Sequence, residues 1–567
     1  MTDPKGFDNG LTNYGDRDFA RYLRRSFAKS MGYTGASLDK PVVGICTSES
    51  GFNNCHRHFP DLIEAVKRGV LAAGALPVTF PVISLGEVFL SPTSMVYRNL
   101  MAMAVEEMIR AQPMDAVVLL GGCDKTVPAM LMGAISADVP AAMVVAYPMM
   151  TGRHRGERLG ACTDCRRFWA SFRAGSVSSD EIEQVEGRLA VTSGTCAVMG
   201  TASTMALMAE TLGMMLPGSA AIPAVHADRL RNAEETGTLA ARMAMTGGPR
   251  PSQVVTPAAI RNALRVLLAV SGSTNAVVHM AAVAYRIGMD LDMAGFNAMS
   301  DETPVVVDLK PVGQGYMEDF HAAGGLEGVL REIAPSLERD TRSITGATLA
   351  DRLSRPLPDP IDRSVIRSRE DPVSAEGGLI ALTGSLAPGG AILKRAAATP
   401  ALLEHEGRAV VFSSLEDLAA RIDDPDLEVT AADVLVLQNA YPKSASGMPE
   451  AGYLPIPRKL ARAGVKDMVR ISDARMSGTA FGTIVLHVTP EAAIGGPLAL
   501  VRTGDLIRLS AREKRIDLLV PPEELDRRRA VWRAARRRTR GYARLYHDHV
   551  LPADQGCDFD FLRHDRA

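Results

Sequence analysis

The chain has 567 residues, of which 46% are hydrophobic and 23% are charged, which is enough apolar material to bury more than one core. The formal net charge of -2 excludes a global attraction to nucleic acid or to an acidic membrane surface, so we expect neither as a partner. No apolar stretch reaches the roughly 20 residues of a membrane span, and the N-terminus lacks the basic and apolar regions of a signal peptide. We therefore expect a soluble, cytoplasmic protein with two large domains.

In the first two thirds of the chain, short apolar runs alternate with amphipathic stretches. The runs at 41–46, 76–83, 116–120 and 141–146 predict buried strands, and the stretches at 61–73 and 94–111 predict helices. This alternation is typical of a parallel sheet covered by helices, so the predicted class is α/β. In such sheets ligands collect beyond the carboxyl ends of the strands.

The pattern changes after the proline-rich segment at 357–360, which we interpret as the connection between two domains. Residues 1–360 would form the α/β domain, and residues 361–567 a smaller β-rich, barrel-like domain with a helical C-terminal tail. The short apolar runs at 378–383, 409–413, 434–437, 483–488 and 506–509 predict its strands. The segment 522–544 has a charged helical pattern, and we interpret its basic run at 527–540 as a solvated helix face.

Three cysteines lie in glycine-rich or polar loops, where a structural core cysteine would be out of place. Cys55 follows Asn53-Asn54, Cys123 stands in Gly-Gly-Cys-Asp-Lys, and Cys196 ends Gly-Thr-Cys. Cys123 directly follows a predicted strand and Cys55 follows another by one loop, so both fall at one edge of the sheet. Cys196 precedes an apolar helical pattern at 197–215, and a helix N-terminus there would stabilise a thiolate. Three thiolates suit an iron-sulfur cluster with one iron left open.

The other four cysteines give weaker signals. Cys162 and Cys165 have the spacing of a redox pair or of half a zinc site, but no second pair accompanies them, so we interpret them as structural. Cys46 lies in a predicted strand and Cys557 near the C-terminus, without a clear ligand partner for either. Seven cysteines in so long a chain do not indicate a disulfide framework.

Carboxylates beside these loops indicate a hard cation. Asp124 follows Cys123, Glu87 follows Gly86 near a strand end, and Glu450 closes Ser-Gly-Met-Pro-Glu. Carboxylates suit Mg²⁺, which keeps water and substrate oxygens in its coordination shell. Any one of them alone would be read as a solvated loop residue.

Five motifs resemble the family of dehydratases that includes dihydroxy-acid, phosphogluconate and sugar-acid dehydratases. They are GGCDKTVP at 121–128, GTC at 194–196, SGSTN at 271–275, GMPE at 447–450 and ISDARMSGT at 471–479. The resemblance implies that Cys55, Cys123 and Cys196 hold an iron-sulfur cluster, for which we favour two irons over four although three cysteines serve either. It also implies a homodimer or a homotetramer.

The same resemblance implies that Glu87, Asp124, Lys125 and Glu450 bind Mg²⁺, with Lys125 as a carbamate. Ser477 matches the family's catalytic base, and we place Lys125 and Thr479 with it as catalytic residues. A serine is too weak an acid to ionise alone, so metal ions and amide donors would have to activate it.

The implied reaction is the elimination of water from a 2,3-dihydroxy carboxylate to give a 2-keto-3-deoxy acid. Magnesium would hold the carboxylate and the 2-hydroxyl, Ser477 would take the C2 proton, and the open iron would help the 3-hydroxyl to leave.

The C-terminal tail at 540–561 resembles the sugar-acid (aldonate) branch of the family, so we expect a sugar acid as substrate, with His547 and His549 donating hydrogen bonds to its distal hydroxyls. The alternative enzyme is a branched-chain dihydroxy-acid dehydratase of amino-acid biosynthesis. A non-catalytic iron-sulfur sensor is the alternative outside enzymes, but a sensor would not need Ser477, Lys125 and Glu450 together.

Overall fold

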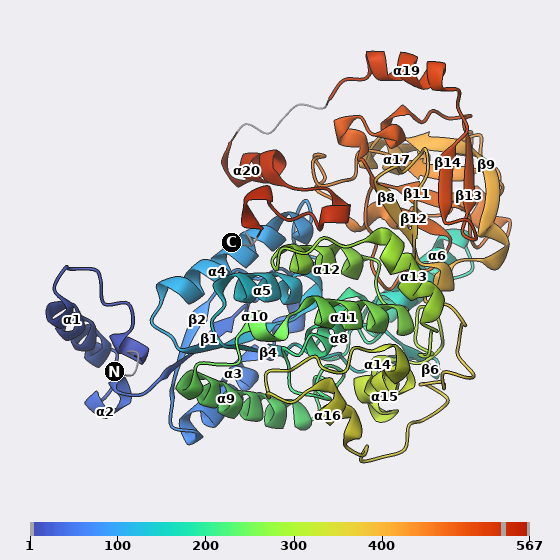
Figure 1. Ribbon diagram of the computed structural model, residues 1–567. Coiled ribbons are helices and arrows are strands. Elements are labelled where there is room, and N and C mark those ends of the chain that lie inside the picture. Colours follow the sequence, from blue (N-terminus) through green and yellow to red (C-terminus); the bar gives the residue numbers. More distant parts are fainter. Residues whose placement is uncertain (1–4, 535–539, 564–567) are drawn as a thin grey trace.

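The computed structural model describes residues 5–534 and 540–563. Its N-terminal part is organised around a parallel four-stranded sheet (Figure 1). The strand order is β2-β1-β3-β4, and the strands are β1 (Val42–Thr47), β2 (Leu76–Pro81), β3 (Ala116–Gly121) and β4 (Ala141–Val145). Every residue of β1, β3 and β4 is buried, as expected where helices cover both faces of a parallel sheet. All four strands coincide with predicted apolar runs to within two residues.

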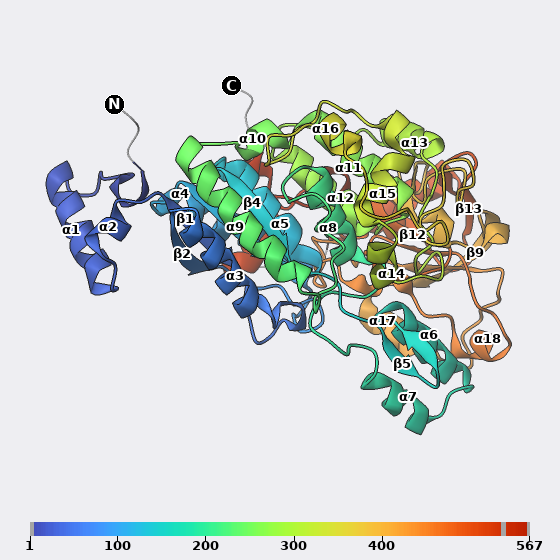
Figure 2. The same ribbon diagram turned by 90° about the horizontal axis from the view of Figure 1, so that it is seen from below.

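Helices cover the two faces of this sheet, as Figures 1 and 2 show. One face carries α3 (Phe59–Ala72) and α9 (Asp228–Thr246), and the other carries α4 (Arg98–Ala111) and α5 (Cys123–Ala137). Against α5 pack α8 (Thr201–Thr211) and α12 (Asn275–Tyr285), in which all but one residue of α8 and every residue of α12 are buried. These two helices are buried on all sides because they lie inside the helical layer.

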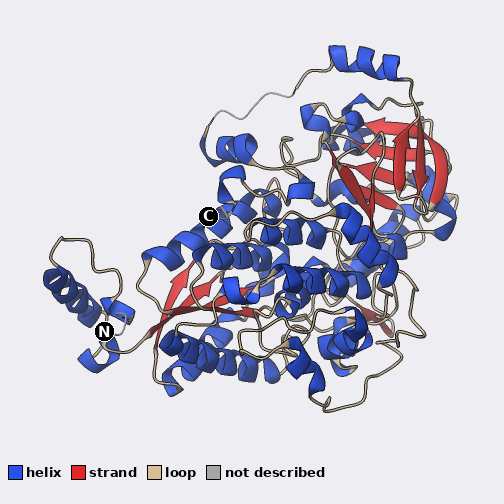
Figure 3. Cartoon of the chain, viewed as in Figure 1, coloured by secondary structure: helices blue, strands red, loops and turns tan. Residues whose placement is uncertain are grey.

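The C-terminal part is built on an eight-stranded sheet of order β14-β13-β9-β10-β11-β12-β8-β7 (Figure 3). Strands β9 to β12 run parallel, and antiparallel strands flank them on both sides. A bridge between Thr383, just after β7, and Arg515 in β14 brings the two edges together, so the sheet is nearly closed into a barrel. The strands are β7 (Ile380–Leu382), β8 (Gly390–Leu393), β9 (Glu404–Phe412), β10 (Val434–Leu437), β11 (Arg470–Ser472), β12 (Ile484–Thr489), β13 (Leu506–Ser510) and β14 (Arg515–Leu518).

The predicted α/β class with a β-rich, barrel-like C-terminal part is therefore confirmed. Strands β8, β11 and β14 were not predicted; they are three or four residues long and give too few positions for a clear pattern. Residues just after the proline-rich segment still pack against the N-terminal part before the chain enters the eight-stranded sheet. Val307 bridges Ile366, and Val305 bridges Ser374.

The helix predicted at 197–215 is shorter than its apolar pattern. It begins at Thr201 after Gly200 and ends before Gly213, which has a φ of 87°. Cys196 therefore lies in the preceding loop, and the prediction that it starts a helix is wrong. Cys123 instead opens a helix, α5, directly after β3.

The charged segment near the C-terminus forms two helices, α19 (Pro522–Val531) and α20 (Gly541–His549). Part of the predicted basic helix face, residues 535–539, lies outside the described residues. After α20 the tail returns to the N-terminal part, where Tyr546 and Phe559 pack with Met95 and Val278. Within the described ranges, no helix has both the length and the apolar character needed to cross a membrane.

Candidate active site

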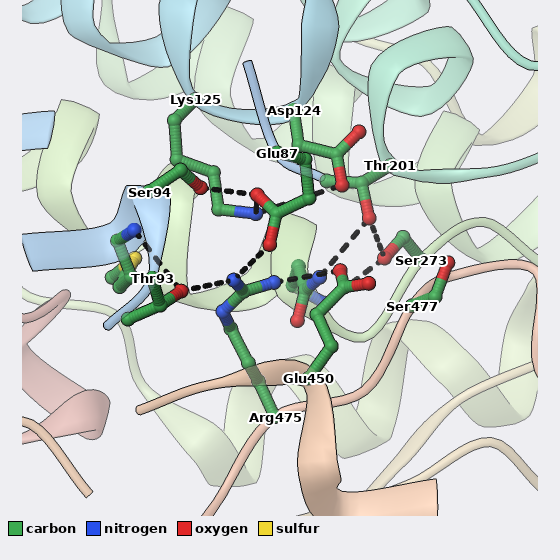
Figure 4. Close-up of polar contacts among 12 residues, drawn as sticks. Glu87, Thr93, Ser94, Asp124, Lys125, Thr201, Ser273, Glu450, Arg475 and Ser477 are labelled. Carbon is green, nitrogen blue, oxygen red and sulfur yellow. Dashed lines mark hydrogen bonds and ion pairs between the residues drawn. The ribbon is translucent and has the colours of Figure 1, made fainter. Parts of the chain in front are cut away.

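Three carboxylates from distant parts of the chain meet between the two sheets (Figure 4). Glu87 lies in the loop after β2, Asp124 in the first turn of α5, and Glu450 at the start of a short 3₁₀ helix, η7 (Glu450–Tyr453), in the loop after β10. One oxygen of each carboxylate lies within 4.8 Å of the others. Such a group of oxygens matches the ligands that Mg²⁺ prefers.

Two buried cations compensate these carboxylates. Lys125 Nζ lies 2.7 Å from Glu87 Oε2 and 3.5 Å from Asp124 Oδ2, and the side chain is fully buried. Arg475 donates from Nη2 to Glu87 over 2.5 Å and from Nη1 to Glu450 over 2.7 Å. Its Nε donates to the Met448 carbonyl over 2.9 Å, so the guanidinium is fixed on three sides. The sequence analysis placed Arg475 in a family motif but gave it no role.

Burial and crowding shift the pKa values of the carboxyl groups in opposite directions. Burial alone would raise the pKa of Glu87, but the charges of Arg475 and Lys125 outweigh it and hold that pKa below its usual range. Burial raises the pKa of Asp124 to about 6; Lys125 opposes the shift, whereas Glu450 and Glu87 add to it. The negative charge of Asp124 is therefore disfavoured at this site unless a cation stabilises it.

Ser477 lies in the loop after β11, with only 7% of its surface exposed. Its Oγ is 2.8 Å from Oγ1 of Thr479. Figure 4 shows Ser477 beside Ser273, and any side chain at the intervening Gly478 would come within 2.6 Å of Ser273. The loop can take this position only because residue 478 is a glycine.

A buried lysine supports the same loop. Lys394 Nζ donates to the Gly478 carbonyl over 3.4 Å, and burial lowers the pKa of this amine to about 7. No sequence signal other than its position after an apolar run marked this residue.

The three predicted cluster cysteines come together near the carboxylates. The neighbouring Cys123 thiol and burial together raise the pKa of Cys55 well above its usual value. The hydrogen bond with Cys162 lowers the pKa of Cys196, but burial and the charges of Asp124, Cys55 and Cys123 outweigh it and raise that pKa. Buried thiols that crowd one another in this way fit a site that receives soft cations such as iron.

His56 ties two of these loops together. Its Nε2 accepts the backbone N–H of Gly122 over 3.0 Å, and its Nδ1 lies 2.7 Å from the Ser48 carbonyl. Burial lowers the pKa of His56 to about 4, so the ring is neutral and carries its proton on Nδ1. The only sequence signal for this role was its position next to Cys55.

A fourth thiol belongs to the same group. Cys162 Sγ lies 3.1 Å from Cys196 Sγ, although the sequence analysis interpreted Cys162 as structural. The neighbouring Thr163 donates to the Thr479 carbonyl over 3.0 Å. This hydrogen bond joins the cysteine loops to the Ser477 loop.

The two predicted substrate histidines lie on α20 and contact acidic side chains. His547 Nδ1 is 3.5 Å from Asp548, and His549 Nδ1 is 3.0 Å from Asp560. The hydrogen bonds described for them do not involve the carboxylates or the thiols. Their contact with a substrate stays a prediction.

Comparison with known proteins identifies the class. The N-terminal model of the dihydroxy-acid/6-phosphogluconate dehydratases matches residues 40–352, and the C-terminal model matches residues 364–557. The chain belongs to this family and is a dehydratase, which confirms the resemblance seen in the five motifs.

Relatives from several bacteria align over nearly the whole chain. L-arabonate dehydratase of Azospirillum brasilense is 47% identical over 560 residues, which are 97% of this chain and 96% of the relative. 6-Deoxy-6-sulfo-D-gluconate dehydratase of Pseudomonas putida is 46% identical over 531 residues, or 93% of this chain and 91% of the relative. A dihydroxy-acid dehydratase of Moorella thermoacetica is 37% identical over 547 residues, or 95% and 98%.

Proposed function

We propose that the chain removes water from a sugar acid with hydroxyls at C2 and C3 and releases a 2-keto-3-deoxy acid. The observation that carries this proposal is the meeting of three carboxylates within 4.8 Å of one another beside four clustered thiols and the Ser477 loop. Hard and soft donors in one site suit a reaction that removes a proton from one carbon and a hydroxyl from the next.

The donor sets fit the two groups that the family implies. Glu87, Asp124 and Glu450, with Lys125 as a carbamate, would hold Mg²⁺, and Cys55, Cys123 and Cys196 would hold an iron-sulfur cluster, for which we propose two irons. When bound, these groups supply positive charge beside the substrate carboxylate and a Lewis acid beside the hydroxyl that leaves.

Ser477 would act as the base at C2. Thr479 Oγ1, 2.8 Å away, orients the Ser477 Oγ by a hydrogen bond and leaves its remaining lone pair for the proton. An ordinary serine hydroxyl ionises only where positive charge and donors stabilise its alkoxide. The buried Arg475 guanidinium and the metal groups that the site would hold would supply this positive charge. The proton taken from C2 leaves Ser477 with the departing 3-hydroxyl as water, and the enol product takes its C3 proton from solvent.

Identity with relatives supports a sugar acid over a branched-chain substrate. The relatives named as arabonate and sulfogluconate dehydratases are 46% to 47% identical, against 37% for the dihydroxy-acid dehydratase. The test is turnover of pentonates and hexonates beside 2,3-dihydroxyisovalerate, with the 2-keto-3-deoxy acid measured directly. Turnover of dihydroxyisovalerate alone would favour the amino-acid pathway enzyme, and no turnover of any dihydroxy acid by iron-loaded protein would favour a sensor.

We also propose that the chain acts as a homodimer or a homotetramer. Helix α1 (Arg17–Ser30) stands away from the rest of the chain in Figures 1 and 2. It exposes three aromatic side chains, Phe19, Tyr22 and Phe27, by 46%, 69% and 65%. Exposed aromatic surface on a projecting helix favours a partner surface. Sedimentation at micromolar concentration should show at least twice the chain mass, and a single 60.5 kDa species would contradict this proposal.

A further inference from the structure

The thiols at the candidate cluster site form two neighbouring pairs. Cys55 is close enough to Cys123 for that thiol to raise the Cys55 pKa, and Cys162 Sγ lies 3.1 Å from Cys196 Sγ. The members of the second pair come from loops 34 residues apart, so chain proximity does not impose their contact. Two pairs of thiols make up the complete protein ligand set of a two-iron cluster, in which each iron takes two thiolates.

The backbone holds Cys162 in a conformation that points to a function. Cys162 precedes helix α6 (Thr163–Ala174) with a φ of 80°, a region that residues other than glycine rarely adopt. Strain of this kind persists only where the surroundings fix it, and it is concentrated at functional sites. Here Asp164 accepts the Gly160 N–H over 2.7 Å and binds Lys310 over 3.0 Å, which clamps the loop on both sides of Cys162.

Cys165, the other cysteine of the motif, has a different position. Its thiol donates to the Cys162 carbonyl over 2.9 Å and so supports the loop from the first turn of α6. The thiol of Cys162, and not that of Cys165, is the one described in contact with the predicted cluster ligand Cys196. Cys165 is therefore a matched control for substitutions of Cys162.

We propose that Cys162 is a fourth thiolate ligand of the cluster and that it occupies the iron position that Cys55, Cys123 and Cys196 leave open. This inference rests on the proposed function. Cys162 loses its thiol proton to solvent when it binds, and it takes a proton up again when a hydroxyl of the sugar acid replaces it. The capped state protects the iron from water and oxygen between turnovers, whereas the uncapped state is the one that binds substrate.

The test compares anaerobically prepared full-length wild type, Cys162→Ala, Cys162→Ser and Cys165→Ala. Iron and acid-labile sulfide are counted, and the visible, resonance Raman and electron paramagnetic resonance spectra are recorded. We expect the same iron and sulfide content in all four proteins. Cys162→Ala should lose intensity in the iron-to-cysteine stretching bands, Cys162→Ser should shift the sulfur-to-iron absorption to shorter wavelength, and Cys165→Ala should match the wild type. Adding a sugar acid to the wild type should reproduce the Cys162→Ala spectrum.

The possible failures are separable. Spectra of Cys162→Ala and Cys162→Ser that superimpose on the wild type would overturn the fourth-ligand assignment while leaving dehydratase turnover intact. A Cys162–Cys196 disulfide found by mass spectrometry in the iron-loaded protein would overturn it as well. A wild type that contains no iron or sulfide would overturn both this inference and the cluster in the proposed function. Loss of iron from Cys162→Ala in a protein that melts at the wild-type temperature, with Cys165→Ala fully loaded, would support ligation.

Discussion

Replacing Ser477 by alanine removes one oxygen atom and tests the proposed base directly. The structural cost is small, because the substitution breaks only the hydrogen bonds of Ser477 Oγ with Thr479, 2.8 Å to Oγ1 and 3.5 Å from the backbone N–H, each of which contributes at most about 0.5 to 1.5 kcal/mol. Alanine also adds no atom that could collide in the tightly packed loop next to Gly478. The variant should therefore fold and keep its iron, magnesium and affinity for substrate. Loss of a positioned base costs a factor of about 10² to 10⁴ in rate, which corresponds to about 3 to 5 kcal/mol of activation free energy.

The assay separates removal of the C2 proton from the later steps. Wild-type enzyme in deuterated water should place solvent deuterium at C3 of the 2-keto-3-deoxy acid. Ser477→Ala should neither form product at the wild-type rate nor exchange the C2 proton of the bound sugar acid. Thr479→Ser keeps a hydroxyl next to Ser477 and serves as the control that retains most activity. Exchange at C2 by Ser477→Ala at the wild-type rate would show that another group is the base.

Three further substitutions test other parts of the site and its surroundings. Cys123→Ser should bleach the iron-sulfur absorbance, whereas Cys46→Ser, in the buried strand β1, should not; the reverse result would refute the ligand set. Lys125→Arg should be inactive, because a guanidinium cannot form a carbamate. Carbon-13 NMR should detect a carbamate signal in wild type equilibrated with labelled bicarbonate and none in the variant. Full activity of Lys125→Arg would exclude a carbamate as a metal ligand. Burial raises the pKa of Glu491 to about 9, and Asp473 adds to the shift, whereas the unfolded carboxyl titrates near 4.5. The folded state therefore binds the extra proton between these values, and stability falls as pH rises from about 4.5 to about 9. Glu491→Gln should remove this loss, so its melting temperature relative to wild type should rise between pH 5 and pH 9; a constant difference would contradict the assigned shift.

The fold could be predicted where the sequence pattern was long and local. The strands β1 to β4 are runs of five or six residues that are mostly buried, and their apolar letters predicted them to within two residues. Helix ends that are set by a single glycine could not be predicted from the apolar pattern. The apolar run after Cys196 continues past both ends of α8, but Gly200 and Gly213 set where the helix begins and ends. Apolar periodicity predicts which residues are buried rather than where a helix is capped.

The parts of the site that were missed depend on contacts between distant segments. Arg475 and Glu87 are 388 residues apart, and no local pattern links them. Cys162 was interpreted as structural because no second cysteine pair accompanies the Cys162 and Cys165 motif in the sequence. In the structure its thiol lies 3.1 Å from that of Cys196, which is 34 residues away. The family motifs identified the residues of the site, but the contacts between them follow only from the way the two sheets pack together.

The charges at the site bear on the state of Lys125. With Glu87, Asp124 and Glu450 ionised, an ammonium on Lys125 and the Arg475 guanidinium leave one net negative charge, which a single divalent ion and a substrate carboxylate would bring to zero. A carbamate on Lys125 lowers the charge by two, so the same divalent ion no longer balances a bound carboxylate. Two negative charges then remain uncompensated. Protonation of Asp124, whose pKa burial raises to about 6, removes one of them, and a second divalent cation removes both. The carbamate therefore predicts that substrate binding strengthens as pH falls toward 6, whereas the ammonium form predicts no such gain.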